Sequence, residues 1–240
     1  MVTTIVSKAE VILLIPISRQ SQVADIRLRA LICVVAIFIA GCQTKSSDAT
    51  MEAVEHEEMI TSLLRYREMI DSSFRSDSNS PFQQDSNVHF SGIKWFPPET
   101  AYRTESILYR NERPETVLVY GTKGDERRLL KYGYFLVSIE GKQLRVNAYK
   151  QVADQPFAHA PGNHLSVWFT DETTGKETYG VGRYLEVGLE SDDRDHLYVL
   201  DFNRAYNPYC AYNPLYSCAI PRREDHLNIA IRAGELKYHP

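Results

Sequence analysis

Residues 130–149 read LKYGYFLVSIEGKQLRVNAY, and this stretch decides the fold class. Two runs rich in β-branched and aromatic residues flank Glu140-Gly141-Lys142, which is typical of a tight turn between paired strands. The sequence therefore predicts a β-hairpin over residues 127–150.

Short runs rich in β-branched and aromatic residues also occur on both sides of this hairpin. Further strands are predicted at 102–109, 116–120, 165–169, 182–189, 197–202 and 227–232. One strong helix is predicted over residues 51–73, where an apolar stripe is formed by Met59, Leu63, Tyr66 and Ile70. We predict a mainly β fold, an antiparallel β-sandwich or barrel-like domain with one N-terminal amphipathic helix, as a single domain over residues 51–240.

The composition is that of an ordinary globular protein. The chain has 240 residues, of which 43% are hydrophobic and 24% charged, with a formal net charge of -4. This mildly acidic balance argues against a nucleic-acid partner, which favours a basic face.

The N-terminal segment has the pattern of an export signal. Residues 31–40, LICVVAIFIA, are apolar and follow two arginines, and their length fits a signal peptide better than a membrane-spanning helix. Residues 39–42, IAGC, resemble the lipobox of bacterial lipoproteins, which implies removal of residues 1–41 and lipidation of Cys42. The alternatives are an apolar segment with a chance cysteine, or a short membrane anchor.

This resemblance carries further expectations. Acyl chains such as palmitate on Cys42 would anchor the protein to a membrane, and residues 42–50 would be a flexible tether. Gln43, in place of Asp, favours the outer membrane facing the periplasm if the cell is Gram-negative. Because residues 1–22 precede a complete signal, we hypothesise that translation starts near Val23.

Several motifs resemble one bacterial family. They are Trp95-Phe96-Pro97-Pro98, TGKETYGVGRYL at 174–185, DFNRAYNPYCAYNPLYSC at 201–218 and AGE at 233–235. Over roughly residues 62–238 the chain resembles domain-of-unknown-function family 1684, which implies a shared fold and often an export signal, but no known activity. The chain departs from the family pattern at Arg222, Arg223 and Asp225.

Cys210 and Cys218 are the pair that remains once Cys33 leaves with the signal and Cys42 is lipidated. Outside the cytoplasm a close pair favours a disulfide, with two reduced thiols or a metal pair as alternatives. A nucleophile formed by a cysteine and His226 would require a reduced thiol. Neither the cysteines nor the histidines have the usual ligand spacing, so we expect no metal and no cofactor.

Polar and aromatic residues gather in the two specific motifs. The candidate ligand-binding residues are Lys176, Tyr179, Arg183, Asn203, Arg204, Tyr206 and Asn207, with Tyr184 beside them. In one interpretation they line a cleft where cations hold a carboxylate or phosphate and tyrosines stack on a ring. In the other they buttress the long loop through hydrogen bonds.

These observations lead to two hypotheses of function. The leading one is a non-catalytic envelope lipoprotein that binds an anionic or sugar-containing envelope ligand or a partner protein, with the membrane as its other partner. The alternative is a small cell-envelope hydrolase or transferase with a site around Lys176, Arg183 and Asn207.

Overall fold

The computed structural model describes residues 53–85, 87–152 and 163–239. The chain divides into two compact units, Met1–Glu55 and His56–Pro240, and of the first unit only residues 53–55 are described. The predicted signal peptide, Cys42 and the tether lie outside the described residues. Lipidation therefore stays a prediction.

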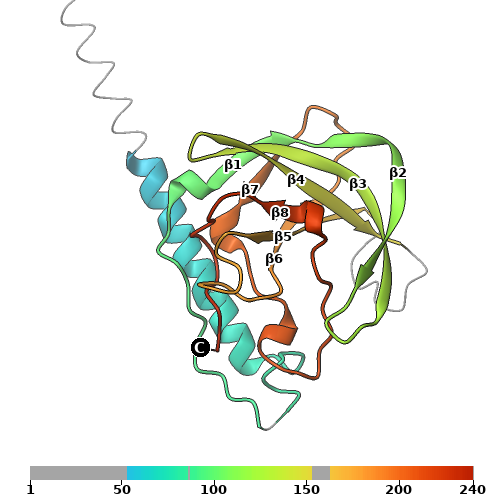
Figure 1. Ribbon diagram of the computed structural model, residues 1–240. Coiled ribbons are helices and arrows are strands. Elements are labelled where there is room, and N and C mark those ends of the chain that lie inside the picture. Colours follow the sequence, from blue (N-terminus) through green and yellow to red (C-terminus); the bar gives the residue numbers. More distant parts are fainter. Residues whose placement is uncertain (1–52, 86, 153–162, 240) are drawn as a thin grey trace, which may run out of the picture. The chain divides into compact units, whose positions relative to one another are not determined.

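The described residues form a mainly β structure with one long helix over residues 53–76 (Figure 1). The strands are β1 (Arg103–Ile107), β2 (Tyr109–Tyr120), β3 (Glu126–Ile139), β4 (Lys142–Gln151), β5 (His164–Asp171), β6 (Arg183–Leu189), β7 (Leu197–Asp201) and β8 (His226–Leu227). Short 3-10 helices are η1 (Thr100–Tyr102), η2 (Phe202–Arg204), η3 (Tyr209–Ala211) and η4 (Arg223–Asp225).

The predicted hairpin is formed by β3 and β4. Ile139 pairs with Lys142, and the two residues between them, Glu140 and Gly141, have φ angles of 49° and 75°. Positive φ at both central positions is the requirement of a two-residue type I′ turn, whose twist matches that of the paired strands. The prediction of this hairpin is confirmed.

The strands wrap around one core. β2-β3-β4-β5-β6 form an antiparallel sheet in that order, with β8 added parallel to β5. β1 and β7 form a separate antiparallel pair, in which β1 contacts β3 and β7 contacts β6. The pair thus connects β3 with β6, the last strand of the curled sheet, and the predicted barrel-like, mainly β fold is confirmed.

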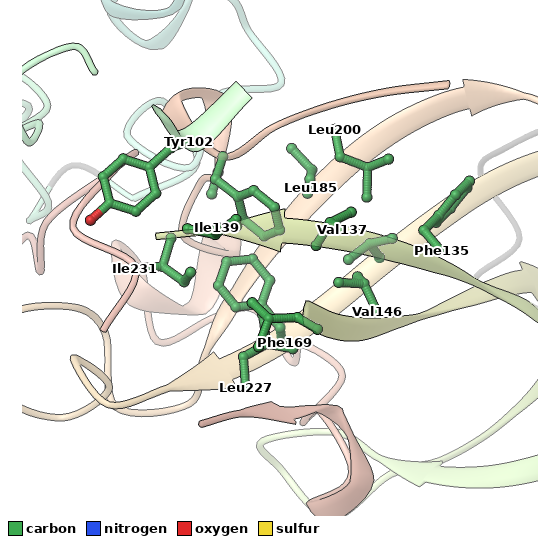
Figure 2. Packing of buried hydrophobic residues seen from close by; sticks show 14 of the residues in the cluster. Tyr102, Phe135, Val137, Ile139, Val146, Phe169, Leu185, Leu200, Leu227 and Ile231 are labelled. Atoms are coloured by element: carbon green, nitrogen blue, oxygen red, sulfur yellow. The ribbon is translucent and has the colours of Figure 1, made fainter. Parts of the chain in front are cut away.

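The core is filled by alternating residues of these strands. Figure 2 shows side chains of the curled sheet and of β7 pointing toward one another, with Phe135, Val137, Val146, Phe169, Leu185 and Leu200 among them. Each is at most 2% exposed. Period-two alternation places these residues on the inner face and their neighbours on the outer face.

The helix over residues 53–76 confirms the predicted N-terminal helix and ends three residues later than expected. Leu63 of its apolar stripe is 1% exposed. Two polar side chains tie it to the chain that follows: Arg67 Nη1 donates to the carbonyl of Phe96 at 2.9 Å, and Asp71 accepts from the N–H of Ile93 at 3.1 Å. Among the described helices, none has the length and apolar character needed to cross a membrane.

The predicted strand over 227–232 is wrong beyond its first residue. Its backbone turns instead, because the N–H of Ile229 donates to the carbonyl of Leu227 at 2.7 Å. The carbonyl of Ile231 accepts from the guanidinium of Arg183 at 2.8 Å instead of from a neighbouring strand. A side chain therefore satisfies a backbone group that pairing would otherwise satisfy.

Candidate functional site

The two motif segments, 174–185 and 201–218, lie side by side. Tyr184 and Tyr206 exchange backbone hydrogen bonds of 2.9 and 3.0 Å, forming an isolated antiparallel bridge. The side chains that the sequence singled out are therefore close in space, but they face different surroundings.

Arg183 lies inside the protein. It is 1% exposed, and its Nη2 donates to Asp171 Oδ2 at 2.6 Å and to the carbonyl of Ile231. Its Nη1 donates to the carbonyl of Ala233. Burial lowers the pKa of Arg183, and the Asp171 carboxylate opposes that effect. The guanidinium thus braces the C-terminal segment and is not open to a ligand.

The two asparagines also hold chain segments together. Asn203 is fully buried, donates to the carbonyl of Glu99 at 2.8 Å and accepts from the N–H of the same residue at 3.0 Å. Asn207 donates from Nδ2 to the carbonyl of Leu236 at 2.8 Å. These contacts match the buttressing interpretation.

The remaining candidates divide between the surface and a pocket. Lys176 is exposed, and Arg204 lies with its guanidinium 4.8 Å from the ring centre of Tyr66. The hydroxyl of Tyr179 donates to the carbonyl of Cys210 at 3.3 Å. Tyr206 is the candidate that lines the pocket.

This pocket, called the tyrosine pocket below, has a volume of about 860 Å³. Its aromatic lining comes from the helix, from the Tyr184–Tyr206 bridge and from the loop that follows, and consists of Tyr66, Phe74, Tyr184, Tyr206, Tyr209 and Tyr216. Ile70, Pro208, Leu215, Arg127, Ser217, Cys218 and Glu235 complete it. A cavity of this size with mostly apolar walls and few polar groups is typical of a small-molecule site.

Glu235 gives the tyrosine pocket a buried acid. It is 1% exposed, and its Oε2 accepts from the backbone N–H of Asn207 at 2.9 Å and from the hydroxyl of Tyr212. Burial raises the pKa of Glu235 to about 7, against the two hydrogen bonds and the charge of Arg183, which lower it. Among the described residues no cation forms a salt bridge with this carboxyl group.

The family model described as "Protein of unknown function (DUF1684)" matches residues 88–236. The chain belongs to the DUF1684 family. A solution NMR structure of an uncharacterized protein from gene locus rrnAC0354 of Haloarcula marismortui is 31% identical, covers 76% of this chain and 96% of its own, and superposes with a TM-score of 0.55. Among curated proteins, none matches.

The DUF1684 match covers only some of the residues that line the tyrosine pocket. It includes Glu235, both cysteines and the Tyr184–Tyr206 bridge, and it excludes the helix over 53–76, which supplies Tyr66 and Phe74. One wall of the pocket is therefore built from residues that the family model does not cover.

Cys218 lines the tyrosine pocket and lies against Cys210. Both are thiols here, with the backbone N–H of Cys210 donating to Cys218 Sγ at 3.1 Å. A hydrogen bond from Cys218, with others from Tyr179 and Thr122, lowers the pKa of Cys210 to about 6. The same hydrogen bond raises the pKa of Cys218, so Cys210 is the group that ionises. The contact is compatible with a disulfide, which stays a prediction.

Sequence reasoning missed most of the tyrosine pocket. Glu235 was noticed only as the end of the AGE motif, and Tyr66 only as part of the apolar stripe. The hint for Glu235 is an acidic residue inside the short run AGEL at 233–236, whose other residues are apolar or small. Among the described residues, no cluster of three or more His, Cys, Asp or Glu is arranged to hold a metal ion.

Proposed function

We propose that this DUF1684 protein is a small-molecule-binding domain whose site is the tyrosine pocket. The observation that carries the proposal is a cavity of about 860 Å³ with six aromatic side chains in its lining and one buried carboxyl group, that of Glu235. Aromatic walls supply apolar contact area, while a single buried polar group fixes the orientation of a ligand.

The proposal includes a membrane tether. The IAGC sequence at 39–42 supports lipidation of Cys42, and the polar residues after it support a flexible connection to the domain. A binding domain held this way would sample molecules at the surface of an envelope membrane.

The expected ligand differs from the first hypothesis. An anionic or sugar-containing ligand was expected from Lys176 and Arg183, but Arg183 is enclosed with Asp171 and Lys176 is exposed. The tyrosine pocket instead favours a molecule with an apolar body and one polar or charged group that interacts with Glu235.

Binding of indole to the purified full-length protein tests this function by isothermal titration calorimetry. Indole offers an aromatic ring and one N–H donor. Ile70→Trp fills part of the pocket from the helix, and the matched control is Met69→Trp, the neighbouring position, which is 58% exposed and lies outside the lining. We expect binding by the wild type and by Met69→Trp, and loss of binding in Ile70→Trp. Absence of binding by the wild type, or equal binding by both variants, would overturn the proposal.

A hydrolase or transferase activity is the second candidate, and one observation favours it. The pKa of Glu235 is raised to about 7, the range in which a carboxyl group serves as a general acid or base. Of the three residues first expected at such a site, Asn207 donates its backbone N–H to the carboxylate of Glu235, and Arg183 donates to the backbone carbonyl of Glu235 at 3.5 Å. Loss of a turnover in Glu235→Gln with retained indole binding would separate catalysis from binding.

A further inference from the structure

We propose that the occupant of the tyrosine pocket is an organic cation, a quaternary ammonium or a protonated amine, held between the aromatic rings and the carboxylate of Glu235. This inference rests on the proposed function and names the class of ligand that the same pocket takes.

The aromatic rings that line the tyrosine pocket pack against one another at steep angles. The ring planes of Tyr184 and Tyr206 make an angle of 78°, and their centroids are 5.8 Å apart. The corresponding angle and distance are 84° and 5.2 Å for Tyr209 and Tyr216. They are 75° and 6.0 Å for Phe74 and Tyr209. Rings packed edge to face present their faces in different directions, and the negative face of an aromatic ring attracts a positive charge.

Hydrogen bonding strengthens this attraction. The hydroxyl of Tyr206 donates to the Glu186 carboxylate, and the hydroxyl of Tyr184 donates to the carbonyl of Ala219 at 2.6 Å. A phenol that donates a hydrogen bond becomes more electron-rich, which makes the faces of both rings more negative. One face of Tyr184 is stacked on Trp168, with the ring centroids 5.3 Å apart.

Among the described residues, no cation forms an ion pair with the carboxylate of Glu235, although the charges of Arg183 and Arg67 act on it without direct contact. Arg127 lines the pocket, but it donates to Asp125 at 2.8 Å and to the carbonyl of Ser217 at 2.6 Å. Arg183 is neutralised by Asp171. A ligand cation would supply the partner that a buried carboxylate requires.

The groups that face Glu235 come from three elements. The helix over 53–76 contributes Tyr66, Arg67 and Asp71, β6 contributes Arg183, and the loop after η3 contributes Tyr212. Arg67 faces a second, separate hollow that Trp95 also lines, and its guanidinium lies 4.8 Å from that ring. The carboxylate of Asp71 raises the pKa of Glu235 further.

A bound cation and a proton compete for Glu235. A ligand cation stabilises the ionised carboxylate, so binding releases a proton when the free group is protonated. With a pKa of about 7, ionisation of Glu235 rises about 10-fold between pH 6 and pH 8. Affinity for a cation should rise by the same factor, and affinity for a neutral molecule of the same shape should not.

Choline and 3,3-dimethylbutan-1-ol test the inference because they match in shape and differ in charge. Both are titrated by calorimetry into the full-length protein at pH 8. We expect about 10-fold tighter binding of choline by the wild type and by Glu172→Gln, which removes one exposed negative charge. Glu235→Gln should lose this preference and still bind indole.

A second measurement keeps the test decisive if Glu235→Gln fails to fold. The affinity of the wild type for choline is measured at pH 6 and pH 8 and repeated in Cys210→Ser, because the Cys210 thiol also titrates near this range. A 10-fold rise in both proteins supports the inference. Equal affinity for the two probes at pH 8, or a choline affinity that does not rise with pH, overturns it, and retained indole binding then leaves the proposed function intact. Loss of both indole and choline binding overturns both.

Discussion

The backbone N–H of Asn207 donates a 2.9 Å hydrogen bond to Oε2 of Glu235, joining the AYNP turn to the AGE segment at one edge of the tyrosine pocket. The hydroxyl of Tyr212 donates to the same oxygen. The carboxyl group is thus held by two fixed donors while it is removed from water. The two hydrogen bonds fix the position of the Glu235 carboxyl group, and its negative charge can be neutralised by a proton or by a bound cation.

Glu235 should make stability depend on pH. The pKa of Glu235 is about 7 in the folded protein and 4.5 for an ordinary, solvent-exposed glutamate such as that of the unfolded chain. Between these pH values the folded protein therefore holds a proton that the unfolded chain has released, and stability falls as the pH rises through this range. The difference corresponds to about 3 kcal/mol. Glu235→Gln keeps an oxygen that accepts from Asn207 and cannot ionise. We therefore expect its free energy of unfolding to gain about 3 kcal/mol relative to wild type between pH 4.5 and pH 8, measured with urea.

Glu115→Gln is the control for this effect, because that side chain is exposed. Its difference from the wild type should stay constant over the same pH range. A constant difference for Glu235→Gln as well would show that Glu235 ionises as an ordinary carboxyl group.

Arg183 should be required for stability and not for binding. Arg183→Met leaves the carboxylate of Asp171 buried without its partner, which costs about 3–5 kcal/mol. Arg204→Met is the matched control, because that side chain is 44% exposed, and it should cost within about 1 kcal/mol. Urea unfolding measures both. If Arg183→Met were stable and bound no indole, Arg183 would have to be counted as a ligand-binding residue.

How much the sequence could predict depends on how local each feature is. The hairpin of β3 and β4 is local, because the alternation of Phe135, Val137 and Ile139 and the turn at Glu140 lie within one short stretch. The extended strand expected after Leu227 failed because the side chain of Arg183, far away in the sequence, satisfies that backbone.

The tyrosine pocket could not be predicted because its walls come from three distant segments. Tyr66 belongs to the helix, Tyr206 to the second motif, and Glu235 to the C-terminal segment. Each motif was visible by itself, and the structure places the two long motifs side by side through the Tyr184–Tyr206 bridge. The sequence did not show which side chains face inward, and so Arg183 was placed with the ligand-binding candidates.

The cysteine pair should reveal its state by reactivity. If the thiols are reduced, iodoacetamide should modify Cys210 with a pH midpoint of about 6 and leave Cys218 largely unmodified, as followed by mass spectrometry. If the predicted disulfide forms, neither cysteine reacts until a reductant is added, and reduction should lower the free energy of unfolding by about 2.5 kcal/mol. Equal reactivity of both cysteines without reductant would contradict both the disulfide and the hydrogen bond between the sulfurs.

Lipidation of Cys42 should decide where the protein resides. In a bacterial host, Cys42→Ser removes the thiol that takes the lipid, so we expect the protein to lose labelling by radioactive palmitate and to leave the membrane fraction. Cys33→Ser is the matched control, since that cysteine belongs to the predicted signal peptide and should leave both properties unchanged. Replacement of Gln43 by Asp should move the protein from the outer to the inner membrane if the host is Gram-negative. Palmitate labelling that persists in Cys42→Ser would place the anchor elsewhere, and the pocket would then have to be considered without its proposed tether.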